Sequence, residues 1–116
     1  MQNLPMKIAS WQEAYSRHLL MTKNEVLQTL LHYRQHKQGD YKILKLGIFG
    51  SVARDQFTEQ SDVDVVVELG YPDLLVLVGI KQDLEQLLQR PVDIVRYREN
   101  MNKFLKQRID QEAVYV

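Results

Sequence analysis

Residues 47–54 read Gly-Ile-Phe-Gly-Ser-Val-Ala-Arg, and after a polar segment residues 61–67 read Ser-Asp-Val-Asp-Val-Val-Val. The first stretch is an apolar run that ends in a small glycine–serine turn. The second is a β-branched run that two carboxylates open, as expected for a strand. A turn that favours phosphate, placed before a pair of carboxylates, is suited to binding a nucleoside triphosphate with a divalent metal ion.

The composition limits the classes of function. The chain has 116 residues, enough for one domain but not for a second, substrate-binding one. Fifteen basic residues balance 15 acidic ones, so no bulk electrostatic attraction to nucleic acid is expected. The chain has no cysteine, which excludes disulfides and thiolate metal sites and fits a reducing cytoplasm.

The N-terminal part differs from the rest of the chain. Residues 1–20 lack the apolar core of a signal peptide, and no apolar run is long enough to span a membrane. Thr22 and Glu25 then form a capping-box pattern, which predicts the start of a helix. We therefore expect an N-terminal extension over 1–20, one compact domain over 21–116, no membrane partner and a cytoplasmic location.

Hydrophobic periodicity predicts one α/β domain with alternating helices and strands, α-β-α-β-α-β-α. The first helix is expected to end before Gly39, a short helix to begin at Val52, and Pro72 to begin the third helix. Strands are expected over 43–49, 63–69 and 92–95, and helices over 22–38, from 52, from 72 to the residues before Pro91, and over 101–112.

Three aspartates are the candidate catalytic and metal-binding residues. In a strand, Asp62 and Asp64 project to one face, whereas the intervening valines face a core. Paired carboxylates repel each other unless a cation such as Mg²⁺ lies between them. If the strand carrying Asp93 lies beside this one, three carboxylates meet and can hold two metal ions about 3.5–4 Å apart, with Asp93 as general base. Asp93 could instead be a solvated edge residue.

The turn supplies the candidate phosphate-binding residues. Gly50 has no Cβ to hold a phosphate away, and the Ser51 hydroxyl and nearby backbone N–H groups can bind phosphate oxygens. Arg54 has two interpretations that the sequence leaves open: it braces the phosphates, or it pairs with a surface acid. Gly50 and Ser51 could also be an ordinary turn, but Asp64 argues against this because aspartate is disfavoured inside strands.

The segment Gly50-Ser51-x₁₀-Asp62-x-Asp64, with Ala53-Arg54 after the serine, resembles the minimal nucleotidyltransferases (MNT) of the DNA polymerase β-like superfamily. The resemblance runs from about Met21 to the C-terminus and includes Asp93 and the closing segment 112–116. It implies a small mixed β-sheet flanked by about four helices. It also implies that Asp62, Asp64 and Asp93 bind metal and that Gly50 and Ser51 hold the nucleotide phosphates.

Members of this family are commonly antitoxins paired with a helical HEPN-type ribonuclease toxin, and some transfer AMP from ATP to a toxin tyrosine. The resemblance therefore implies a Mg²⁺-dependent adenylyltransferase antitoxin with ATP as substrate and a HEPN-type toxin as partner. Because few residues follow Asp93, the acceptor surface must come from that partner or from another copy of the chain. The alternatives are an antitoxin that acts by binding alone, an enzyme for small molecules, and a regulatory nucleotide-binding domain.

Overall fold

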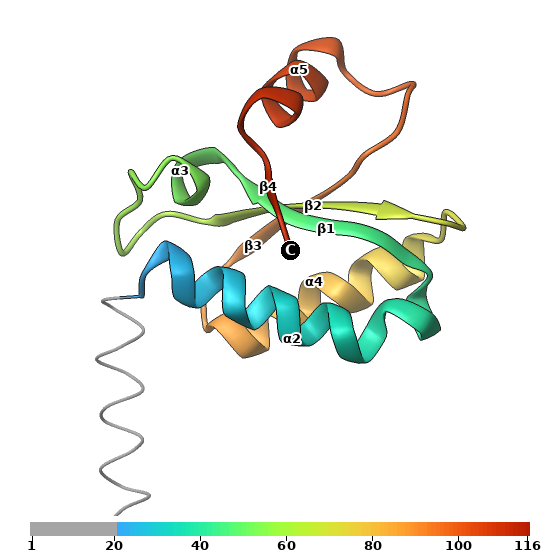
Figure 1. Ribbon diagram of the computed structural model, residues 1–116, viewed down its shortest axis with the longest axis horizontal. Helices are drawn as coiled ribbons and strands as arrows, with labels where there is room; N and C mark the ends of the chain where they lie inside the picture. The colour runs from blue at the N-terminus through green and yellow to red at the C-terminus, as the bar shows by residue number, and fades with distance from the viewer. Residues whose placement is uncertain (1–20) are drawn as a thin grey trace, which may run out of the picture.

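A four-stranded mixed sheet organises the chain, of which the computed structural model describes residues 21–116 (Figure 1). The strands are β1 (Ile43–Phe49), β2 (Val63–Leu69), β3 (Val92–Arg96) and β4 (Val114–Tyr115), in the spatial order β3-β2-β1-β4. β1 is antiparallel to both β2 and β4, whereas β2 and β3 are parallel. The expected extension over 1–20 lies outside the described residues.

Helices cover the two faces of this sheet unequally. α2 (Lys23–Tyr41) and α4 (Leu74–Leu88) lie side by side against one face, and α5 (Lys103–Glu112) lies on the other (Figure 1). α3 (Gly50–Ala53) is a single turn at the end of β1. The expected mixed sheet flanked by about four helices is confirmed for the described part of the chain.

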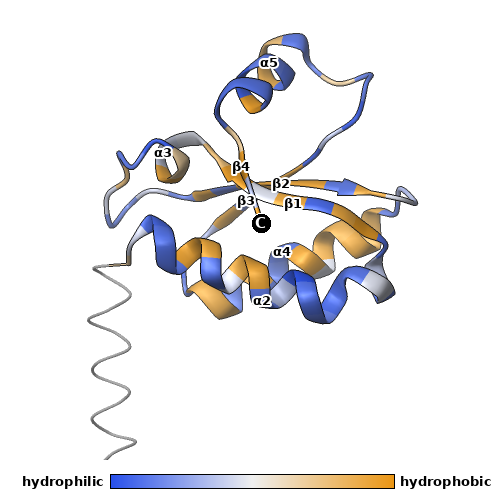
Figure 2. Cartoon of the chain, viewed as in Figure 1, coloured by the Kyte–Doolittle hydropathy of each residue, from blue (hydrophilic) through white to orange (hydrophobic). Residues whose placement is uncertain are grey.

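β2 is apolar along both faces, since each face packs against a different core. Val63, Val65 and Val67 are fully buried in the main core beneath α2 and α4. Val66 faces the opposite way and packs with Phe49 and Ile109 in a smaller core under α5. Figure 2 shows the apolar residues concentrated in the sheet and on the inner sides of the helices.

The start of α2 follows the prediction, but its end does not. The Glu25 N–H donates to the Thr22 hydroxyl at 3.1 Å, and the Thr22 N–H donates to the Glu25 carboxylate at 3.0 Å, which completes the capping box. The expectation that the helix ends before Gly39 is wrong, because α2 continues to Tyr41 and is capped by Lys42 in the left-handed conformation. A glycine inside a helix costs only about 1 kcal/mol, so it does not stop a helix that continues on both sides of it.

Other parts of the prediction also differ from the structure. α5 begins at Lys103 rather than at residue 101, and β3 ends at Arg96 rather than at residue 95. α3 begins at Gly50 rather than at Val52. Pro72 precedes α4 instead of beginning it, because the Asp73 carboxylate caps the helix by accepting from the Leu75 N–H at 2.9 Å. The last residues add β4, a strand that the expected order of elements lacked. No helix in the described part of the chain is both long and apolar enough to cross a membrane.

Candidate active site

The three predicted aspartates gather where β2 and β3 begin. Asp64 of β2 and Asp93 of β3 are direct partners in the parallel register, so their side chains share a face. Asp62 lies immediately before β2 and is exposed. Val63, Val65 and Val67 point into the main core, as the alternation predicted. The strand that carries Asp93 therefore lies beside the strand that carries Asp64, as predicted.

Burial and the negative charges of Asp93 and Asp62 disfavour ionisation of the Asp64 carboxylate. Burial raises the pKa of Asp64, and the negative charges of Asp93 and Asp62 raise it further. The positive charges of Arg108 and Arg54 oppose the increase without cancelling it. The unliganded fold therefore places a carboxylate where its ionised form is disfavoured, an arrangement that a bound cation would relieve.

The turn before α3 packs directly against this carboxylate. Gly50 has φ +72°, in the left-handed region that residues with a Cβ rarely adopt. A Cβ at Gly50 would collide with the carboxylate of Asp64. Ser51 follows on α3, where its carbonyl accepts from the Gln56 N–H at 2.8 Å. The predicted phosphate-binding turn and the predicted metal-binding carboxylate are thus in contact.

Arg54 pairs with an acid from the other end of the chain. Its Nη1 lies 3.1 Å from both carboxylate oxygens of Glu112, the last residue of α5. Its side chain remains 42% exposed, and its Nε donates to the Gln56 side-chain oxygen at 3.1 Å. Of the two interpretations of Arg54, pairing with an acid is what the structure contains, and the phosphate-bracing role stays a prediction.

Glu112 also contacts Gly50 and Arg108. Its Oε1 accepts from the Gly50 N–H at 2.7 Å and lies 3.5 Å from Nη2 of Arg108. Burial alone would raise the pKa of Glu112, but the Gly50 N–H, Arg54 and Arg108 together hold that pKa below its usual value. Glu112 is therefore a carboxylate that stays ionised at the edge of the site.

Comparison with known proteins decides the family. The family described as "Nucleotidyltransferase domain" matches residues 27–116 of this chain. The chain belongs to the nucleotidyltransferase domain family. Its resemblance to the minimal nucleotidyltransferases is thereby confirmed, and so is its class as an enzyme.

Two curated relatives of this nucleotidyltransferase are adenylyltransferases by name. A Methanocaldococcus jannaschii protein named as a protein adenylyltransferase is 33% identical over 98 residues, which are 84% of this chain and 100% of the relative. Protein adenylyltransferase MntA of Thermococcus cleftensis is 29% identical over 98 residues, 84% of this chain and 98% of that protein. Both matches span nearly the whole relative.

Solved structures share the fold. A minimal nucleotidyltransferase superposes with a TM-score of 0.61 at 32% identity, covering 76% of this chain and 93% of that one. A toxin–antitoxin structure with AMP-PNP has a TM-score of 0.61 at 20% identity, covering 82% and 72%. A Shewanella oneidensis complex of a tri-AMPylated HEPN toxin with an MNT antitoxin has a TM-score of 0.53 at 20% identity, covering 80% and 66%.

The donor set of this nucleotidyltransferase suits a metal ion that shares its ligands with a substrate. Among the described residues, no three side chains of His, Cys, Asp or Glu converge tightly enough to form a metal cage by themselves. Mg²⁺ does not require one, because it usually binds through one or two carboxylates together with waters and phosphate oxygens. The adjacent carboxylates of Asp64 and Asp93 fit that mode of binding.

Sequence reasoning missed two residues of this neighbourhood. From the sequence, Glu112 is assigned only to the last helix and to the closing segment of the family resemblance, and Arg108 has no assigned role. Their spacing on a predicted helix, i and i+4, was a usable signal for an ion pair. Nothing in the spacing indicates that this pair reaches Gly50.

Proposed function

We propose that this chain transfers AMP from ATP to a tyrosine hydroxyl of a HEPN-type toxin and neutralises the toxin in this way, with Mg²⁺ as metal ion and in the cytoplasm. The observation that carries the proposal is the contact of the Gly50 turn with Asp64, whose register partner is Asp93. The names of the adenylyltransferase relatives and the toxin–antitoxin complexes among the structural neighbours support it.

Each site residue has a role in this proposal. Asp62, Asp64 and Asp93 supply carboxylate oxygens for Mg²⁺, which the crowding of negative charge around Asp64 favours. Gly50 leaves room for the triphosphate, and the Ser51 hydroxyl and the exposed part of Arg54 hold its oxygens. Bound Mg²⁺ would neutralise phosphate charge and orient the triphosphate.

The reaction is an in-line displacement at the α-phosphorus of ATP. The acceptor oxygen forms a bond to that phosphorus while the bond to the pyrophosphate oxygen breaks. The hydroxyl proton passes to Asp93, which is exposed and so accessible to an incoming acceptor. The products are an AMP-modified hydroxyl, pyrophosphate and one proton.

The acceptor comes from another molecule in this proposal. After Asp93 the described chain forms only the rest of β3, α5 and β4, which are used to complete the sheet and cover part of it. One structural neighbour is an MNT antitoxin in complex with a tri-AMPylated HEPN toxin, which supports an acceptor surface on a partner. A toxin partner supplies that surface, and the assembly is then a hetero-oligomer.

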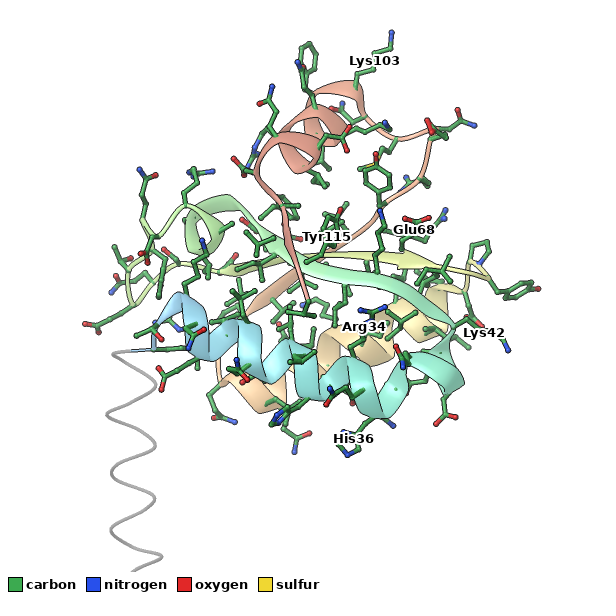
Figure 3. All side chains as sticks on the ribbon, viewed as in Figure 1. Arg34, His36, Lys42, Glu68, Lys103 and Tyr115 are labelled. Atoms are coloured by element: carbon green, nitrogen blue, oxygen red, sulfur yellow. The ribbon has the colours of Figure 1, made fainter. Side chains whose placement is uncertain are left out.

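The test is the intact mass of the toxin encoded beside this chain after incubation with the chain, ATP and Mg²⁺. We expect mass added in steps of one AMP, and no addition with the Asp62→Asn/Asp64→Asn variant. Glu68→Gln is the matched control, because Glu68 also lies on β2 but far from α3 (Figure 3). That variant should modify the toxin like the wild-type chain.

The alternative is an antitoxin that acts by binding alone. An unchanged toxin mass in a stable complex would establish that alternative, provided the Asp62→Asn/Asp64→Asn variant also still protects cells. Rapid AMP transfer to free small molecules, without transfer to the toxin, would instead exclude both antitoxin functions and indicate a small-molecule enzyme.

A further inference from the structure

Glu112 connects the C-terminal end of the fold to the nucleotide turn. One carboxylate accepts the Gly50 N–H at 2.7 Å, meets Nη1 of Arg54 at 3.1 Å and lies 3.5 Å from Nη2 of Arg108. Charge-assisted bonds of this kind are the stronger ones in proteins. The group therefore holds the turn and two guanidinium groups in a fixed mutual arrangement.

Both sides of Glu112 are anchored in the backbone. Before it, the last turn of α5 is closed by the Ala113 N–H, which donates to the Ile109 carbonyl at 2.9 Å. After it, Val114 and Tyr115 pair with β1 in antiparallel register. The Glu112 side chain is only 20% exposed, so it is packed between elements rather than free in solvent.

Two roles are consistent with a carboxylate that contacts anion-binding groups. It could occupy the place of a phosphate and leave when ATP binds, or it could position the groups that ATP uses. The anchored backbone on both sides and the low exposure oppose departure. The Arg54 side chain also remains 42% exposed while it contacts Glu112.

We propose that Glu112 is a positioning residue for the nucleotide site. It fixes the Gly50–Ser51 turn against Asp64 and orients Arg54 and Arg108 beside that carboxylate. This inference rests on the proposed function only in taking a nucleoside triphosphate as the ligand. The contacts themselves are present in the unliganded chain.

The experiment measures binding of Mg²⁺·AMP-PNP by calorimetry to the full chain and to the Glu112→Ala and Glu112→Gln variants. We expect Glu112→Ala to weaken binding about tenfold or more, since it removes a charged hydrogen bond and two ion pairs. Glu112→Gln keeps an acceptor for the Gly50 N–H and should recover part of the loss. The kcat for AMP transfer at saturating ATP should change much less than KM for ATP.

A readout without nucleotide tests the contact directly. The Gly50 amide resonance of the unliganded protein should move strongly in Glu112→Ala and less in Glu112→Gln. Asp110→Ala is the matched control, because Asp110 lies on the same helix and also pairs with a base one turn earlier, Lys106. It loses a hydrogen bond from Tyr97 as well, but it should leave AMP-PNP affinity and the Gly50 resonance unchanged.

Each other outcome overturns the inference. Tighter binding in Glu112→Ala would show that the carboxylate competes with phosphate. Unchanged affinity with a lower melting temperature would show a purely structural contact, and absence of AMP-PNP binding by the wild-type chain would remove the nucleotide site altogether. If the wild-type chain binds AMP-PNP but leaves the toxin unmodified, the proposed function fails while the affinity series still decides the role of Glu112.

Discussion

Gly50 is the residue at which the backbone and the Asp64 carboxylate constrain each other most directly. Its φ of +72° lies in the left-handed region, and the space that a Cβ would need is occupied by the Asp64 carboxylate. Both the left-handed backbone conformation and the close approach of the Asp64 carboxylate therefore require glycine at this position. Any other residue must move the turn or the aspartate.

The first prediction at this scale concerns Gly50→Ala. We expect the free energy of unfolding to fall by about 1–2 kcal/mol from the left-handed conformation alone, with a further loss from the displaced Asp64. AMP transfer should be abolished, because the turn and the carboxylate can no longer lie together. Urea unfolding and the toxin mass assay measure the two effects.

Gly39→Ala is the control for this prediction. Gly39 lies inside α2, and a Cβ there would meet no atom within 4 Å. The substitution should raise the free energy of unfolding by about 0.5–1 kcal/mol and leave AMP transfer intact. Equal stability effects at the two glycines would contradict our account of Gly50.

The sequence indicates some site residues and not others for a clear reason. Asp64 and Asp93 are visible because aspartate is disfavoured inside an apolar strand, and Asp62 because its spacing of two from Asp64 places both on one face. Glu112 is not visible, because its contact with Gly50 joins residues 62 positions apart. Local patterns carry no information about such a contact.

At the scale of elements, Arg90 holds the segment that leads to the aspartates. It is buried, with 5% exposure, at the end of α4. Its Nη1 donates to the carbonyls of Thr58 at 2.9 Å, Glu59 at 3.3 Å and Ser61 at 3.1 Å. The guanidinium group thus fixes the loop between α3 and β2, directly before Asp62.

The second prediction concerns Arg90→Ala. We expect the free energy of unfolding to fall by about 2–3 kcal/mol, because three loop carbonyls lose a buried, charged donor. Amide hydrogen exchange in the loop should accelerate, and AMP transfer should fall with it. Arg98→Ala is the control, since Arg98 is exposed and donates to the nearby Arg96 carbonyl at 2.8 Å. Equal effects of the two substitutions would contradict the role of Arg90.

Most elements were predictable because each has its own pattern. The valine run of β2 and the capping box of α2 indicate a strand and a helix start without tertiary context. Three features needed that context: the continuation of α2 through Gly39, the start of α3 at Gly50, and β4. β4 has only two residues, too few for any periodicity, and exists because β1 offers it a free edge.

For the whole molecule, unequal coverage of the sheet explains where the site lies. α2 and α4 cover one face of the sheet, and α5 covers part of the other face (Figure 1). The aspartates lie on that second face, where β2 and β3 begin. The α2 face is also connected to the last described residues, because Arg34 donates to the Val116 carbonyl at 2.7 Å and to the Leu44 carbonyl at 3.2 Å (Figure 3).

The mixed sheet was implied by the family resemblance, whereas composition and periodicity predicted only an α/β layer domain.

The third prediction concerns the expected domain boundary. A chain that begins at Met21 should keep the melting temperature and the Mg²⁺·AMP-PNP affinity of the full chain, because the capping box at Thr22 starts α2 by itself. Thermal unfolding and calorimetry measure both quantities. A clear loss of either would show that residues 1–20 belong to the domain.

The placement of β4 beside β1 also has a consequence for biosynthesis. The first described strand obtains its outer neighbour, and the Gly50 turn its carboxylate partner, from residues far along the sequence, 62 positions away in the case of Gly50 and Glu112. The ribosome synthesises Asp62, Asp64 and Asp93 before it reaches Glu112 and β4. A nascent chain therefore has its aspartates before it has the contacts that fix the turn, and the site is complete only once Glu112 and β4 have also left the exit tunnel.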